Sequence, residues 1–271
     1  MIGNAEWWSR LKINRDRTEI FLDTWCSSRF KRSIRTYSRL LNNLNEDEKR
    51  FEKTTSEIIN SLDHSVGFSI PILEILDLKN GWLDNGTLFF EYGIQVDAVM
   101  RFNFWEFNFY DKLFNAGAEM IQFSRKYSGC LYAHCQLLKH QSPTLENTVT
   151  VRGGHDELCF FPLVLQIAHG VQFKLELIDL YSVISMASKQ GMSNVIHYCD
   201  VLLTQTQEHS SYKAVDRYWI HFAIEYNLKR WMVQLLKTMK SVKDCIDKED
   251  IEMMSNESMK MFIAKFLYQK F

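Results

Sequence analysis

Apolar and polar residues alternate most regularly over residues 81–96. Within this stretch Asp84-Asn85-Gly86 predicts a turn, because Asn and Gly tolerate a positive φ. After the turn, apolar side chains recur at every second position, which is the period of a β-strand with one buried face. The apolar face carries Leu88, Phe90, Tyr92, Ile94 and Val96, and the opposite face carries Thr87, Phe89, Glu91 and Gln95.

The rest of the first hundred residues also has a β-type pattern. Short apolar bursts separated by polar residues predict strands joined by turns up to about Val99. Residues 34–41 fit a strand or a short helix, and we favour the strand. A further strand begins at Gly67, and Pro71 places it near a sheet edge because proline cannot donate a ladder hydrogen bond. The charged residues 45–53 predict a solvated loop, and residues 73–78 a short helical turn.

The second half of the chain changes period. Ile121 and Phe123 suggest a strand, residues 128–129 a turn, and residues 130–133 a second strand. From Phe160 onward apolar residues recur at intervals of three and four, which is typical of helices with one buried face. Helices are expected within residues 160–168, 177–187, 195–203, 221–238 and 258–267, the last of them capped by Ser255. A stripe of Met232, Leu235, Leu236 and Met239 is interpreted as core packing.

An aromatic-rich stretch, residues 102–114, lies between the two halves. We interpret it as a connector whose aromatic side chains alternate sides and lock two domains together. The alternative is an exposed aromatic patch that binds a partner.

The composition argues against several classes of protein. The chain has 271 residues, 24% of them charged, and its net charge is −1, whereas a dedicated nucleic-acid binder is usually strongly basic. A basic stretch within residues 29–39 is interpreted as a solvated strand face or a contact for an acidic client, with RNA binding as the alternative. No apolar run is long enough to cross a bilayer, so we expect no membrane association. Residues 1–17 do not resemble a signal peptide, and the six cysteines fit reduced thiols in the cytoplasm or nucleus.

One group of residues has metal-ligand chemistry. Cys130, His134, Cys135 and His140 are close in sequence. Zinc ligands usually come as two short pairs with a long spacer, and this spacing does not match that pattern. We therefore predict no metal site.

A second group has the residue types of a nucleophile and a base, namely Cys159 with His155 or His169. Cys159 adjoins Phe160-Phe161, and we interpret it as a small core residue. The glycine turn at residues 152–155 is not followed by the Lys-Ser/Thr of a phosphate-binding loop. We therefore predict no cofactor and no enzymatic activity.

Several motifs of the first half resemble the MATH domain. They are Trp25-Cys26, Leu40-Leu41-Asn42, Gly67-Phe68 and, above all, residues 81–99, where the family pattern is Gly-Phe/Trp-Leu-x-Asp-Asp-x-Leu-x-Ile/Val-Glu-x-x-Val-x-Val. The resemblance implies an antiparallel β-sandwich over residues 1–107, without its first strands, because Trp7 already sits where a middle strand is expected. It also implies a client-peptide site at Val66, Gly67 and Phe68, in which Val66 replaces a tryptophan of the family's groove.

Motifs of the second half resemble a BTB (POZ) domain followed by a helical, BACK-like extension. They lie at residues 131–143, 161–170, 186–203 and 223–228. The resemblance implies an α/β BTB fold over residues 108–205 and a helical extension over residues 206–271. Cys135 replaces the family's lysine after His134. The segment between Pro143 and Phe160 is too short for the helix and loop that usually meet the cullin, and Glu146 and Glu157 complete no such motif, so the cullin contact is unknown.

The resemblances together imply an α+β multidomain protein that acts as a substrate adaptor of a cullin-based ubiquitin ligase. In such proteins the MATH domain binds a client peptide, and the BTB domain forms a homodimer and docks the cullin scaffold. The alternative is a divergent scaffold or oligomerisation protein of the same fold that recruits no cullin. Neither interpretation involves nucleic acid.

Overall fold

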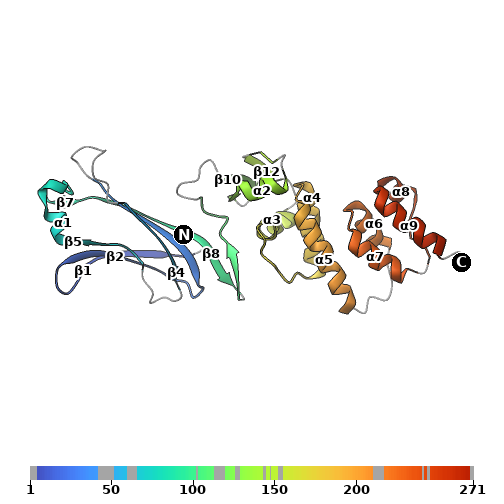
Figure 1. Cartoon of the computed structure of the whole chain (residues 1–271), viewed down its shortest axis with the longest axis horizontal. Helices are drawn as coiled ribbons and strands as arrows, with labels where there is room; N and C mark the ends of the chain where they lie inside the picture. Colours follow the sequence, from blue (N-terminus) through green and yellow to red (C-terminus); the bar gives the residue numbers. More distant parts are fainter. Residues whose placement is uncertain are drawn as a thin grey trace. The chain divides into compact units, whose positions relative to one another are not determined.

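The structure is a computed structural model of the whole chain, and it divides into two units, Met1–Ala118 and Glu119–Phe271. The first contains antiparallel sheets and the second is largely helical, which confirms the α+β class (Figure 1). The predicted division at residues 107 and 205 differs from this one and stays a prediction. The residues described are 5–41, 52–59, 66–101, 103–112, 120–125, 129–142, 145–146, 148–151, 155–209, 217–239, 241–242 and 245–268.

Two antiparallel sheets and a small hairpin form the first unit. One sheet has the order β1-β2-β5, with β1 at Trp7–Ile13, β2 at Glu19–Cys26 and β5 at Ser69–Pro71. The other has the order β4-β3-β8-β9, with β4 at Glu52–Ile59, β3 at Arg32–Leu40, β8 at Phe90–Arg101 and β9 at Phe104–Phe107. Strands β6 (Leu83–Asp84) and β7 (Thr87–Leu88) form the hairpin, and helix α1 (Ile72–Leu76) and a 3-10 turn (Leu78–Asn80) precede it.

The alternation that predicted a strand after residue 86 is confirmed in β8. Asn85 and Gly86 have φ values of 49° and 79°, as the predicted turn requires. Phe90 and Tyr92 pack against a buried cluster, and Val96 is buried. The pattern then changes at a β-bulge: Ile34 pairs with Val96 and Ser33 with Ala98, so that Asp97 is an extra residue. The bulge shifts the inward positions by one, and Val99 shares a buried cluster with Val96.

Buried side chains of the two sheets belong to common clusters. Leu22 of β2 and Leu40 of β3 lie in one cluster, and Trp7 of β1 packs against a second that contains Ile34 and Val96. The two sheets therefore bury their facing surfaces against each other.

Several local predictions for the first unit are confirmed and two are corrected. The strand at 34–41, the edge position of Pro71 and the helical turn after it correspond to β3, β5 and α1. The connector interpretation is wrong for Phe104–Phe107, which pairs with β8 as a strand. Glu52 and Lys53 begin β4 instead of ending a loop, and residues 45–51 lie outside the described part.

A three-stranded sheet begins the second unit. Strands β10 (Met120–Arg125) and β11 (Gly129–His134) form the predicted hairpin, and helix α2 (Cys135–Gln141) follows. Strand β12 (Thr148–Val151), which was not predicted, pairs parallel with β10. Phe123 of β10 and Phe161 are fully buried, with their ring centroids 5.0 Å apart at an interplanar angle of 61°. The sheet therefore packs on the helix that carries Phe161.

Helices follow the sheet in the described part of the second unit. They are α3 (His155–Ala168), α4 (Leu177–Lys189), α5 (Ser193–His209), α6 (Arg217–Glu225), α7 (Lys229–Thr238), α8 (Lys248–Met253) and α9 (Asn256–Tyr268). The single helix predicted for 221–238 is wrong, because the chain breaks at Asn227, whose φ is 52°. The Leu228 N–H donates to the Ala223 carbonyl and the Asn227 N–H to Ile224, which is the Schellman pattern of a helix C-terminus. Ser255 accepts from the Ser258 N–H, as its predicted cap role requires. The four residues of the predicted core stripe, Met232, Leu235, Leu236 and Met239, are buried.

No helix within the described ranges combines the length and the apolar character that crossing a bilayer requires.

Candidate functional site

The predicted client residues Val66, Gly67 and Phe68 run alongside strand β2 and continue into β5. The Thr24 N–H donates to the Val66 carbonyl at 2.8 Å, and the Leu22 N–H donates to the Phe68 carbonyl at 2.9 Å. Strand β5 is the last strand of its sheet, and in the described part of the chain it pairs with β2 alone. The segment is therefore a sheet edge.

The side chains of this segment are used for packing. Val66 and Phe68 are only 3% and 5% exposed, and the Phe68 ring meets Phe90 edge-on at a centroid distance of 6.0 Å. Ser69 and Pro71 are exposed, whereas Ile70 between them is buried. A partner could contact the outer backbone edge of the segment and the exposed Ser69 and Pro71. Client contact by Val66, Gly67 and Phe68 stays a prediction.

Gly67 has a steric role that the sequence did not indicate. A Cβ atom at this position would lie 1.5 Å from the backbone oxygen of Leu22. Real Cβ atoms do not approach so closely, so glycine is needed for the segment to pair with β2.

The basic stretch at residues 29–39 is divided between the two faces of β3. Arg35 makes a bidentate ion pair with Asp97, with Nε and Nη2 2.8 and 2.7 Å from its oxygens. Arg32 lies on the opposite face and is 2% exposed, and burial lowers the pKa of its guanidinium. The charge at these two positions is therefore paired or buried, which does not favour a continuous anion-binding face.

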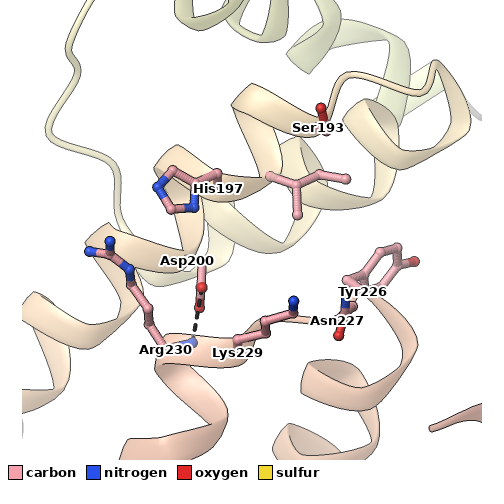
Figure 2. A pocket seen from close by; sticks show the side chains of 8 residues that line it. Ser193, His197, Asp200, Tyr226, Asn227, Lys229 and Arg230 are labelled. Atoms are coloured by element: carbon pink, nitrogen blue, oxygen red, sulfur yellow. Dashed lines mark hydrogen bonds between the residues drawn. The ribbon is translucent and has the colours of Figure 1, made fainter. Parts of the chain in front are cut away.

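A pocket of about 500 Å³ opens in the second unit between α5 and the α6–α7 turn (Figure 2). Successive turns of one face of α5 form one wall, since its residues there are spaced by three and four. The lining residues are Ser193, Ile196, His197 and Asp200 from α5, and Tyr226, Asn227, Lys229 and Arg230 from the turn and the start of α7.

Asp200 holds the two walls of this pocket together. It is 5% exposed, and its carboxylate accepts hydrogen bonds from the backbone N–H groups of Arg230 (3.1 Å) and Trp231 (2.9 Å). These groups belong to the first turn of α7, whose own N-cap residue, Leu228, makes no side-chain cap. Asp200 is therefore a capping residue supplied from another helix, and the helix dipole favours its charge.

The rim of the pocket is cationic. Lys229 and Arg230 are exposed, and so is His197 on the facing wall (Figure 2). Lys229 forms an ion pair with Glu257 of α9, and this contact lowers the pKa of the Glu257 carboxyl.

The four residues considered as metal ligands differ in their contacts and in their burial. The Gln122 side chain donates to Cys130 Sγ at 3.3 Å, Cys135 is buried and His140 is exposed. The His134 ring lies beside that of His169, with centroids 5.7 Å apart. A search of the described residues finds no cluster of three His, Cys, Asp or Glu side chains that fits a metal ion.

One prediction about the residues considered as nucleophile and base is wrong. Cys159 is exposed on α3, so its interpretation as a core residue is wrong, although the neighbouring Phe161 is buried. His169 Nδ1 donates to the Leu165 carbonyl at 2.7 Å, and burial lowers the pKa of His169 to about 4. His169 is therefore neutral at physiological pH, and it is hydrogen-bonded to the last turn of α3, which it directly follows.

Sequence reasoning assigned no function to Asp200, which it treated only as part of a motif. The sequence did contain a clue. Asp200 follows Cys199 on the apolar face of a predicted helix, and a buried carboxylate requires hydrogen-bonding partners. Its partners lie 30 and 31 residues further along the chain. No spacing rule for a single helix predicts such a contact.

No protein-family model matches the chain, and a search of curated proteins finds none with significant sequence similarity. The MATH and BTB resemblances rest on the motifs alone.

Proposed function

We propose that the chain is a non-enzymatic protein–protein interaction adaptor of the MATH–BTB type, acting as the substrate-recognition subunit of a cullin-based ubiquitin ligase. The observation that carries this proposal is the order of the elements. Two packed antiparallel sheets are followed by the hairpin β10–β11 and helix α2. Strand β12, which is parallel to β10, and a run of helices come next. In this proposal the first unit is a client-binding sandwich and the second combines a BTB-like module with a BACK-like extension.

The client site of this proposal is the β5 edge, from Val66 to Pro71. Peptides commonly bind by adding a strand to an exposed sheet edge, where backbone hydrogen bonds supply affinity. The buried side chains of Val66 and Phe68 hold that edge in place. The exposed Ser69 and Pro71 are the side chains that a bound peptide would pass.

The second unit supplies dimerisation and cullin docking in this proposal, and the adaptor works in the cytoplasm or nucleus. A dimer would present two client sites, and effective concentration would raise the apparent affinity for a client with two recognition segments.

The cullin interaction is tested with the full chain. Purified N-terminal regions of several cullins are mixed with it and analysed by size-exclusion chromatography with light scattering. We expect a stoichiometric complex with one cullin at micromolar concentration. If the folded chain binds none of them, the ligase proposal is wrong.

A specific observation favours the second candidate, a scaffold of the same fold without cullin recruitment. Between α2 and α3 the described residues form only strand β12 before α3 begins at His155. This leaves little chain for an additional cullin-contacting helix. Self-association in the same light-scattering experiment, without any cullin complex, is the result expected for this candidate.

The client site is tested by peptide selection from a random display library against the full chain. The selected peptides are measured against Ser69→Arg, which alters an exposed β5 side chain without opening the core. We expect binding to weaken about tenfold, a difference of ~1.4 kcal/mol. Unchanged affinity would place the client elsewhere. Phe68→Ala is less informative, because Phe68 is a core residue and its loss destabilises the unit.

A further inference from the structure

Strand β1 is the other edge of the sheet that ends at β5. Within the described part of the chain it pairs with β2 alone. Alternate residues of an edge strand turn their backbone N–H and C=O groups away from the neighbouring strand, which leaves a template for another strand. Strand β1 therefore has an outer backbone edge along Trp7–Ile13.

The core-side face of β1 is only partly covered. In the register with β2, Leu11 lies opposite Leu22 and Ile13 opposite Ile20, so each pair shares a face of the sheet. Leu22 is 4% exposed, but Leu11 and Ile13 are 47% and 58% exposed. The apolar surface of the sheet thus continues past β2 and ends in two half-exposed aliphatic side chains.

The opposite face of β1 carries two cationic side chains. Arg10 and Lys12 lie there, and the pairing strand β2 places the carboxylates Asp23 and Glu19 on the same face of the sheet. Lys12 forms an ion pair with Asp23, and the Arg10 guanidinium lies 5.4 Å from the centroid of the Trp25 ring. An added strand would lie directly beside β1 and not beside the carboxylates of β2, so acidic side chains on its corresponding face would oppose Arg10 and Lys12.

We propose that the β1 edge binds an extended segment of another protein in which apolar and acidic residues alternate. The apolar residues cover Leu11 and Ile13, the acidic residues face Arg10 and Lys12, and the backbone pairs with the outer edge of β1. This site lies at the opposite edge of the sheet from the proposed client site and does not depend on it. A second copy of this chain fits less well, because pairing two β1 strands would bring two Arg10-Lys12 faces together, and like charges across a strand pair are destabilising.

The probe is a fluorescently labelled peptide of about eight residues, the length of a typical strand, in which Val and Glu alternate. Binding to the full chain is measured by fluorescence anisotropy. Two matched peptides serve as controls, one with Lys in place of Glu and one with N-methyl groups on alternate residues to block backbone pairing. We expect each control to bind at least about tenfold more weakly, a difference of ~1.4 kcal/mol.

Protein variants locate the site. Leu11→Lys adds a charge to the half-exposed apolar face and is expected to weaken binding about tenfold, ~1.4 kcal/mol. Arg10→Glu is expected to reverse the preference between the Glu and Lys peptides. The matched control is Ile58→Lys, since Ile58 is 51% exposed on edge strand β4 of the other sheet, and it should leave binding unchanged. Circular dichroism checks that each variant is folded.

Several results would overturn the proposal. They are the absence of binding by the Val/Glu peptide at millimolar concentration, equal binding of the Lys or N-methylated peptide, and equal effects of Leu11→Lys and Ile58→Lys. A dimer of the unmodified chain that Leu11→Lys dissociates would show that the occupant of the edge is a second copy.

Discussion

Strand β1 in the first unit and helix α4 in the second differ in how completely their inward-facing side chains are buried. In β1 the aliphatic side chains of Leu11 and Ile13 are about half exposed. In α4 five consecutive residues, from Val183 to Ala187, are buried. Both units have buried apolar side chains, and in the described part of the first unit the outer strand β1 has an incompletely covered face.

The difference follows from how each element satisfies its backbone. A helix forms its hydrogen bonds internally, so α4 needs only packing partners for its side chains. A strand satisfies its backbone through neighbouring strands and covers its buried face with another layer, and within the described residues β1 pairs with β2 alone. We therefore expect the second unit to depend on internal packing and the first to depend on contacts along its sheet edges.

The largest expected effect is on the packing of the second unit. Phe123→Ala removes a fully buried ring that contacts Phe161, and such substitutions cost about 3–5 kcal/mol. Chemical denaturation should show this loss in the transition of the second unit. Phe89→Ala, at a ring that is 51% exposed in the first unit, is the control and should have little effect. Equal shifts of all transitions would contradict the expectation that this packing stabilises the second unit in particular.

Acid should destabilise the second unit more than the first. Burial lowers the pKa of His169 in the folded protein from 6.5 to about 4. Between these values the unfolded chain binds the additional proton, so the free energy of unfolding falls as the pH falls, by up to about 3 kcal/mol. Denaturant titrations at pH 7 and pH 4.5 measure the loss. His169→Gln should reduce it, whereas His140→Gln, at an exposed position, should not. The same pH dependence in both variants would contradict the assignment to His169.

Gly67→Ala tests how strictly the first unit depends on its sheet edge. The added Cβ would collide with the Leu22 backbone oxygen, and we expect a loss of about 2 kcal/mol, as for an overpacked site. Ser69→Ala, two residues further on and exposed, is the matched control. Thermal unfolding followed by circular dichroism measures both. If Gly67→Ala is as stable as Ser69→Ala, the edge adjusts more easily than we infer.

The smallest effect is expected at the cap between α5 and α7. Asp200→Ala removes the acceptor of two backbone N–H groups, and loss of a helix cap costs about 1 kcal/mol. Ser193→Ala, at an exposed residue on the same pocket wall, should cost less. Amide hydrogen exchange at Arg230 and Trp231 should rise in the Asp200 variant only. Unchanged exchange would mean that another group caps α7.

Local periodicity predicted many of the elements. The turn at Asn85-Gly86, the inward side chains of β8 before the bulge and the Ser255 cap follow from residues that are close in sequence. Strand β12 was missed because Thr148–Val151 is short and its pairing with β10 is a long-range contact. The helix break at Asn227 also had a local signal, because Asn tolerates the left-handed conformation, but the apolar stripe across it was given more weight.

The candidate sites were harder to predict than the fold. Sequence motifs led to Val66, Gly67 and Phe68 but could not show that Val66 and Phe68 face the core. The partly covered face of β1 depends on how the two sheets pack, which no local pattern contains. The cap made by Asp200 joins residues about thirty positions apart, so it depends on helix packing that only the folded chain establishes.

The Asp200 cap also has a mechanical consequence. The motif-based boundary at residue 205 falls within α5, and the two hydrogen bonds that Asp200 accepts from α7 cross it. A stretching force applied to the chain ends would have to break this link before the two segments could separate. We therefore expect helices α5 and α7 to unfold together under force. The boundary between two sequence modules need not be a flexible hinge.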